Sequence, residues 1–270
     1  MIFESHAHYD DPAFDEDREE LLGSMREHGI EYIINVAASL ATTESTIALT
    51  EQYPFIYGAA GVHPDDTKEL NEERFAWLRE QCAREKIVAV GEIGLDYYWD
   101  STPREVQKKW FVRQLELAKE TGLPVIIHSR EAAQETFELI RQHHAGTTGG
   151  VIHCFSYARE MAEAYVKLGY FIGVGGVVTF KNGRKLKETV EAVPLSSILL
   201  ETDCPYLSPV PNRGKRNSSR NLPYIAQEIA KIKGISAEEV VEATCRNAKK
   251  LFLEGRAAYG SDIGQSEKYD

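Results

Sequence analysis

Short runs of β-branched and apolar residues alternate along the chain with longer stretches in which apolar positions recur at helical spacing. Residues 105–121 are one such stretch, ended by Gly122 and followed by Pro124 at the start of the next run. The predicted strands are Ile2–Ser5, Tyr32–Val36, Phe55–Ala60, Ile87–Glu92, Pro124–His128, Gly150–His153, Phe171–Val174 and Ser197–Glu201. Because strands that alternate with helices form buried parallel sheets, these eight units predict a single (β/α)8 TIM-type barrel of the α/β class.

An open, doubly wound sheet is the structural alternative. Such a fold normally carries a G-x-G-x-x-G sequence after an early strand. The nearest match, residues 173–178, lacks the last glycine and comes late in the chain. We therefore expect the closed barrel as one domain over residues 1–254, followed by a polar C-terminal tail over residues 255–270.

The composition is that of a globular protein, with 43% hydrophobic and 27% charged residues. A net charge of −11 argues against a protein that coats nucleic acid with a basic surface, although a locally positive cleft would still bind an anion. The four cysteines lie far apart in the sequence, which favours reduced thiols. Since neither a secretion signal nor a bilayer-spanning stretch is evident, we expect a cytoplasmic protein with no membrane contact and no obligate protein partner.

Polar side chains gather where the predicted strands end, which is where (β/α)8 barrels place their reactive groups. Six residues occupy these positions: His6, His8, Glu92, His128, His153 and Asp203. Residues two apart on a strand share a face, so His6 and His8 would both point into the barrel mouth. Taken singly, each residue has an ordinary alternative, such as a hydrogen-bonded core histidine, an arginine partner for Glu92 or a helix cap for Asp203.

Together these six side chains indicate a metal centre. Four imidazoles and two carboxylates would be costly to bury at one rim without a cation, and they are ordinary ligands for transition metals. Because six ligands exceed the needs of one tetrahedral ion, we predict two divalent ions, Zn, Mn or Mg, with Glu92 bridging them. The charge of two such ions outweighs that of the two carboxylates, so an anionic substrate is favoured.

Further residues near the predicted mouth could hold such an anion. They are His63, Arg130, Lys181, Arg213, Lys215 and Arg216. Loops after the seventh and eighth strands of barrels commonly bind phosphate, and arginine matches phosphate oxygens with paired N–H donors. Two alternatives stay open: Arg130 could pair with Glu131 or Glu135, and residues 213–220 could form a solvated loop.

Eight short segments carry a recognisable set of motifs in order along residues 1–253. They are His6–Asp10, Gly61–Pro64, Gly91–Tyr98, Leu123–Arg130, His153–Ser156, Thr179–Asn182, Glu201–Leu207 and Arg213–Asn217. Together they resemble the TatD family of metal-dependent deoxyribonucleases, within the amidohydrolase-like barrels. The sequence departs from the family's usual pattern at Ala7, Tyr9 and Tyr157, none of which is an expected ligand, although Tyr157 could narrow the cleft.

The resemblance implies specific roles for the residues at the strand ends. One metal would be held by His6, His8, Glu92 and Asp203, and a second by Glu92, His128 and His153. Asp203 would also orient or deprotonate the attacking water, and Glu92 and His63 would complete the catalytic group. The implied reaction is exonucleolytic hydrolysis of DNA phosphodiester bonds by a metal-bound hydroxide, on single-stranded or frayed 3′ ends.

Contacts to such a substrate would run through the phosphate backbone, in which Arg213, Lys215 and Arg216 would hold a neighbouring phosphate. Any base preference would come from stacking on aromatic residues, which could equally pack the barrel. The aromatic candidates are Tyr97, Tyr98, Trp99 and Phe155.

Two other functions fit the same residues. The barrel and its metals could hydrolyse a small amide, lactone or phosphate ester, because metal-activated water attacks carbonyl and phosphoryl centres alike. A non-catalytic scaffold with structural metals is the other alternative, although closed structural sites do not need so many ligands facing an open mouth. Assays of these substrates side by side with purified protein would separate the functions.

Overall fold

Eight parallel strands form one sheet in chain order, in a computed structural model that describes residues 1–99, 101–144 and 146–254. The strands are β1 (Ile2–Ala7), β2 (Ile30–Val36), β3 (Ile56–Ala60), β4 (Ile87–Asp96), β5 (Val125–Arg130), β6 (Gly150–Ile152), β7 (Phe171–Val174) and β8 (Ile198–Leu200). Each predicted strand overlaps an observed one. The tail predicted over residues 255–270 lies outside the described residues.

Backbone contacts between the end of β1 and the segment after β8 close the sheet into a barrel. Ala7 forms a parallel bridge with Cys204, the His8 N–H donates to the Cys204 carbonyl at 2.9 Å, and the Asp203 N–H donates to the His6 carbonyl at 3.0 Å. The Ser5 hydroxyl adds a bond of 2.8 Å to the Leu200 carbonyl. The predicted (β/α)8 barrel is therefore confirmed, and its seam joins the two segments that carry His6, His8 and Asp203.

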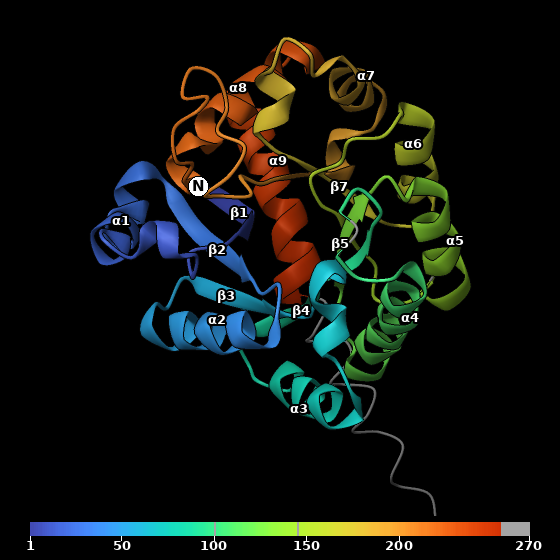
Figure 1. Cartoon of the computed structure of the whole chain (residues 1–270). Coiled ribbons are helices and arrows are strands. Elements are labelled where there is room, and N and C mark those ends of the chain that lie inside the picture. The colour runs from blue at the N-terminus through green and yellow to red at the C-terminus, as the bar shows by residue number, and fades with distance from the viewer. Residues whose placement is uncertain (100, 145, 255–270) are drawn as a thin grey trace, which may run out of the picture.

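Helices surround the sheet as an outer layer, while α9 crosses the middle of the view in Figure 1. They are α1 (Arg18–Gly23), α2 (Leu40–Gln52), α3 (Glu72–Cys82), α4 (Arg104–Thr121), α5 (Ala133–His143), α6 (Arg159–Lys167), α7 (Arg184–Ala192), α8 (Leu222–Lys233) and α9 (Ala237–Lys249). Local sequence sets several of their ends. Ser39 caps α2 in a capping box with Thr42, and Gly122, the predicted end of α4, ends that helix in a left-handed conformation.

Two apolar layers hold the barrel. The larger layer packs the outer faces of the strands against the surrounding helices. The smaller one joins residues of the strands, such as Phe3 and Ile126, to Phe252 in the π-helical turn that follows α9. Phe3 stacks on Phe252 with ring centroids 6.2 Å apart. Because α9 and this turn bury apolar side chains of the strands, they support the barrel interior and leave the C-terminal mouth to polar groups.

No helix within the described ranges is long and apolar enough to cross a membrane.

Candidate metal centre

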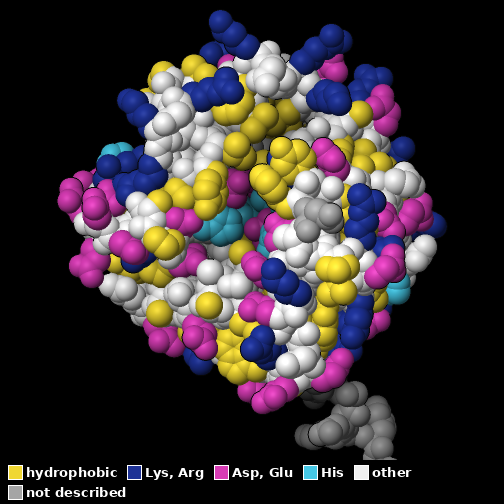
Figure 2. Space-filling model, viewed as in Figure 1, with side chains coloured by type: hydrophobic (Ala, Val, Ile, Leu, Met, Phe, Trp, Pro, Cys, Tyr) yellow, Lys and Arg dark blue, Asp and Glu magenta, His cyan; other side chains and the backbone are white. Residues whose placement is uncertain are grey.

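The six side chains predicted as metal ligands meet at the C-terminal mouth of the barrel. They come from β1 and the residues after it (His6, His8), from β4 (Glu92), from β5 (His128), from the residue after β6 (His153) and from the segment after β8 (Asp203). The mouth is hollowed, and Figure 2 shows histidine side chains at the bottom of this hollow with acidic and apolar side chains around them. The parallel strands thus bring together groups that lie up to 197 positions apart, from His6 to Asp203.

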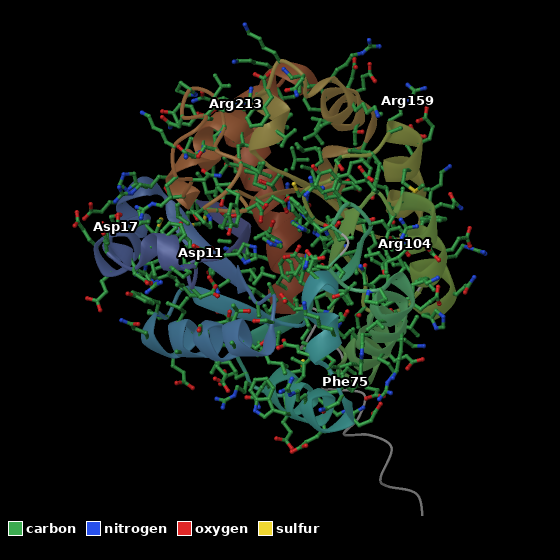
Figure 3. The ribbon with its side chains drawn as sticks, viewed as in Figure 1. Asp11, Asp17, Phe75, Arg104, Arg159 and Arg213 are labelled. Carbon is green, nitrogen blue, oxygen red and sulfur yellow. The ribbon has the colours of Figure 1, made fainter. Side chains whose placement is uncertain are left out.

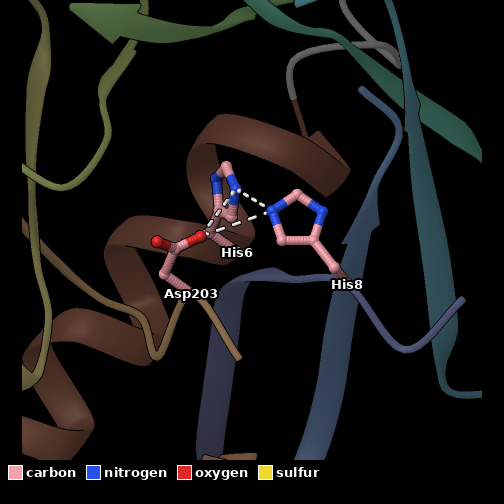
Figure 4. Close-up of side chains that lie close together, drawn as sticks. All are labelled: His6, His8 and Asp203. Carbon is pink, nitrogen blue, oxygen red and sulfur yellow. Dashed lines mark hydrogen bonds and ion pairs between the residues drawn. The ribbon is translucent and has the colours of Figure 1, made fainter. Parts of the chain in front are cut away.

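His6, His8 and Asp203 form the first group (Figure 4). Nε2 of His6 lies 3.6 Å from Oδ1 of Asp203, and Nε2 of His8 lies 3.3 Å from the same oxygen. The two ring nitrogens face each other at 3.1 Å. Nδ1 of His8 is fixed by the Val36 carbonyl at 2.8 Å, so Nε2 is the nitrogen that this ring turns toward the group.

Glu92 divides its two oxygens between two pairs of histidines. Its Oε2 lies 3.5 Å from Nε2 of His6 and 3.8 Å from Nε2 of His8. Its Oε1 lies 2.7 Å from Nε2 of His153 and 3.0 Å from Nδ1 of His128. A carboxylate with one oxygen toward each pair has the arrangement that a bridging ligand between two ions requires.

The pKa values in this cluster describe a site that attracts positive charge. Burial opposes ionisation of Glu92, but the neighbouring His153 and His128 hold its pKa well below the usual range. Burial likewise disfavours protonated His8 and His128, yet carboxylates raise the pKa of His8 to about 10 and that of His128 to about 9. Burial and His153 lower the pKa of His6 to about 4. The buried Glu92 carboxylate therefore stays ionised among groups that compete for protons, and a cation satisfies the same demand.

The donor set fits divalent metal ions. Two pairs of histidines bring ring nitrogens close together: the nitrogens lie 3.1 Å apart in His6 and His8, and 3.4 Å apart in His128 and His153. In each pair the two nitrogens must either share a proton or both turn lone pairs to a cation. Imidazole and carboxylate are ligands for zinc and manganese, and the carboxylates also suit magnesium. The described side chains thus offer candidate ligands for divalent metal ions.

Two further carboxylates lie next to the histidines of the cluster, and the sequence analysis did not select them as site residues. Oδ2 of Asp96 lies 2.9 Å from Nε2 of His128. Glu201 lies beside the rings of His6 and His153, where one atom of each residue falls within 4.8 Å of the others. The signal that could have found them is the two-residue repeat of a strand, in which every second side chain lies on the same face. Asp96 stands four residues after Glu92, and Glu201 stands two residues before Asp203.

The cleft above the cluster has a volume of about 580 Å³, enough for a small ligand. His63 borders it beside His128, with ring centroids 4.3 Å apart. Nδ1 of His63 accepts a hydrogen bond from the Asp65 N–H at 3.3 Å, so Nε2 is left to carry the ring proton. Burial and the adjacent His128 lower the pKa of His63 to about 3, which keeps this ring neutral.

The predicted phosphate-binding residues divide into those at the cleft and those away from it. Arg130 lines the cleft, and its guanidinium stacks 3.8 Å from the ring centroid of Tyr98 rather than pairing with Glu131 or Glu135. Arg213 lies over the Phe180 ring at 4.4 Å, on the loop after β8 (Figure 3). Lys181 and Lys215 are exposed on the loops after β7 and β8.

Arg216 is not brought to the cluster. Its guanidinium binds both oxygens of Asp17, at 2.7 and 2.5 Å, and the carbonyl of Ala13 at 2.6 Å. Asp17 lies at the outer edge of the molecule, whereas Asp11 is nearer the middle of the mouth in Figure 3. The phosphate role predicted for Arg216 stays a prediction and requires this ion pair to open.

The aromatic side chains predicted to stack on bases also differ in position. Phe155 is buried in the core, the packing alternative given above. Tyr97 donates its hydroxyl to Glu135 at 2.5 Å. Tyr98 and Trp99 are half-exposed. Tyr157 contacts Ser129 through its hydroxyl at 2.9 Å, at the wall beside His128.

A (β/α)8 barrel that gathers histidines and carboxylates at its C-terminal mouth has the architecture of a metal-dependent hydrolase. The chain belongs to the TatD family: the family model described as TatD related DNase matches residues 3–253.

Individual relatives match nearly the whole chain. YabD from Bacillus subtilis, described as an uncharacterized metal-dependent hydrolase, is 42% identical over 93% of this chain and 99% of its own length. The 3'-5' ssDNA/RNA exonuclease TatD from Rahnella is 32% identical over 93% of this chain and 98% of its own length. The crystal structure of the TatD homologue YjjV from Escherichia coli has a TM-score of 0.87 and 34% identity, and covers 93% of this chain and 97% of that one.

Proposed function

We propose that this chain is a metal-dependent exonuclease that hydrolyses phosphodiester bonds of DNA from single-stranded or frayed 3′ ends. The observation that carries the proposal is Glu92, whose two oxygens face two separate pairs of histidines at the bottom of an open cleft. The similarity to the Rahnella protein named as a 3'-5' ssDNA/RNA exonuclease supports the choice of substrate.

Two sets of residues would hold the ions, one from His6, His8, Glu92 and Asp203 and the other from Glu92, His128 and His153. When bound, two divalent ions would lower the pKa of a coordinated water toward neutrality and offset the charge of the phosphate. Zinc and manganese suit these mixed nitrogen and oxygen ligands, and magnesium is the third candidate.

Asp203 and His63 supply the proton chemistry in this proposal. Although burial opposes its charge, His8 holds the pKa of Asp203 below its usual range, so the carboxylate is ionised and can accept a proton from the attacking water. Neutral His63 donates its Nε2–H to a phosphate oxygen, where negative charge grows during the reaction.

Basic residues at the end of β5 and on the loops after β7 and β8 hold the strand on either side of the scissile bond. Arg130 lines the cleft itself, while Lys181, Arg213 and Lys215 are exposed on the loops after β7 and β8. Contacts of this kind are made to phosphates and carry no direct sequence information, so cleavage should depend weakly on base identity and strongly on salt.

Metal removal tests the proposed function. Purified protein stripped with a chelator should lose cleavage of a single-stranded oligonucleotide and regain it with Mn²⁺, Zn²⁺ or Mg²⁺. A duplex or a 3′ end blocked by phosphorothioate linkages should be cut more slowly. Turnover of a lactone, an amide or a small phosphate ester without any DNA cleavage would contradict the proposal and favour a small-molecule hydrolase.

Asp96 should act as a positioning residue for the metal centre. The variant Asp96→Asn keeps the oxygen that accepts from the Tyr98 N–H at 2.8 Å but removes the anionic partner of the His128 ring. We expect metal affinity to fall roughly 10- to 100-fold, which is typical when a residue behind a ligand is changed. Competition with a chelating indicator measures this, and thermal unfolding of the metal-free variant controls for the fold. An unchanged metal dissociation constant would refute the role.

A further inference from the structure

The segment that follows Asp203 presents two apolar side chains to the cleft. Tyr206 is 56% exposed and Leu207 is 38% exposed, and both line the cleft that contains the metal-ligand cluster. Val177 borders the cleft with them. Exposing large apolar groups to water is unfavourable. Apolar side chains inside a polar active-site cleft therefore indicate a contact with an apolar part of the ligand.

Leu207 is held in an unfavourable backbone conformation. Its φ of 54° lies in the left-handed region, which residues with a Cβ rarely adopt. Its carbonyl oxygen packs against Gly176 so closely that a Cβ on the glycine would lie 2.1 Å from it. The surrounding structure therefore fixes this backbone while the side chain remains partly in solvent, and backbone strain of this kind is concentrated at functional sites.

Tyr206 is held by hydrogen bonds at its backbone and at its ring hydroxyl. Its N–H donates to the Asp203 carbonyl at 2.9 Å, and its hydroxyl donates to Oδ2 of Asp11 at 2.9 Å. Asp11 follows β1 and Tyr206 follows β8, so this hydrogen bond joins the two segments that meet at the seam of the barrel. A ring held in this way loses little conformational entropy when a ligand packs on its face.

We propose that Tyr206 and Leu207, the apolar ledge, form a stacking subsite for the nucleobase next to the phosphate held at the metal centre. This inference rests on the proposed function and names the part of the substrate that the ledge recognises. A nucleotide combines an anionic phosphate with a base that has an apolar face. The cleft offers the metal-ligand cluster, which includes Asp203, for the phosphate and Tyr206 and Leu207 for the base. Because every base has an aromatic face, such a subsite is tolerant of sequence.

The other exposed aromatic pair fits this role less well. Arg130 already stacks on Tyr98, at 3.8 Å from the ring centroid. Neither Tyr98 nor Trp99 is among the residues that line the cleft, whereas Tyr206 and Leu207 are. The apolar ledge is therefore the better-placed contact for the base that lies beside the metal centre.

Equilibrium binding separates the base from the phosphate. Isothermal titration calorimetry in saturating Mn²⁺ should be run with thymidine 5′-monophosphate and with deoxyribose 5-phosphate, which lacks the base. Wild-type protein should bind the nucleotide more tightly by roughly 5- to 150-fold, the range expected for one stacked base. Tyr206→Ala should bring that ratio close to one, Tyr206→Phe should retain most of it, and Leu207→Gly should lower it.

The matched control is Tyr224→Ala, a tyrosine on α8 that is exposed to the same extent as Leu207, at 38%, and does not line the cleft. This variant should keep the wild-type ratio. Equal affinities for the two phosphates in wild type, or an unchanged ratio in Tyr206→Ala, would overturn the stacking subsite. A normal ratio in a protein that cleaves no DNA would support the subsite and reject the proposed exonuclease.

Discussion

Replacing Glu92 by glutamine should lower phosphodiester cleavage by about 1,000-fold or more, the largest loss expected for a single substitution in the cleft. The amide has one oxygen and no charge, so it cannot present an anionic oxygen to both histidine pairs that Glu92 faces at 2.7 to 3.8 Å. Metal ions stabilise charge in the transition state by several kcal/mol. At about 1.4 kcal/mol per tenfold change in rate, losing that contribution gives a loss of this size.

The rate constant for cleavage of a single-stranded oligonucleotide measures this effect, together with circular dichroism to show that the variant is folded. Glu163→Gln is the matched control, because Glu163 is exposed on α6, away from the residues that line the cleft. It should retain wild-type activity. If Glu92→Gln also cleaved DNA at the wild-type rate, Glu92 could not be the residue on which the metal centre depends.

Gly94→Ala should have the largest effect on stability. Gly94 pairs with His128 across β4 and β5, and a Cβ on it would lie 1.8 Å from the His128 carbonyl oxygen. Its φ of 151° is also one that residues with a Cβ rarely adopt. Because backbone atoms of two paired strands cannot move apart as a side chain can, we expect a loss of about 3 kcal/mol or more in the free energy of unfolding.

Chemical denaturation of the metal-free protein measures this loss without a contribution from bound ions. Gly23→Ala provides the comparison, since a Cβ at this position, the last residue of α1, would meet nothing within 4 Å. That variant should be neutral or slightly stabilising, because alanine favours helix more than glycine does. Equal stability of Gly94→Ala and wild type would mean that the register of β4 on β5 differs from the one described.

Much of the fold could be predicted from the sequence because a buried parallel strand is a local pattern. Each of the eight apolar runs became a strand in the expected order, and the H-x-H spacing brought His6 and His8 to one face. The position of a residue at the end of such a strand then determines which end of the barrel it occupies, so the six histidines and carboxylates could be grouped before any distance was known.

The remaining features depend on contacts that no local pattern encodes. Strand β4 continues past Glu92 to Asp96 although Gly91 and Gly94 lower its strand propensity. Glycine is suited to both positions because β4 passes so close to β5 that a Cβ on either residue would collide with it. Asp17 pairs with Arg216 from 199 positions away, and this contact turns an expected phosphate ligand toward the protein. Tyr206 likewise depends on Asp11, 195 positions earlier.

Anomalous X-ray diffraction from crystals grown with Mn²⁺ or Zn²⁺ tests the central claim most directly. Two peaks are expected per chain, one among His6, His8 and Asp203 and one beside His128 and His153, with one oxygen of Glu92 directed to each. A single peak at saturating metal, or two peaks that do not share Glu92, would contradict the account of a bridged dinuclear centre.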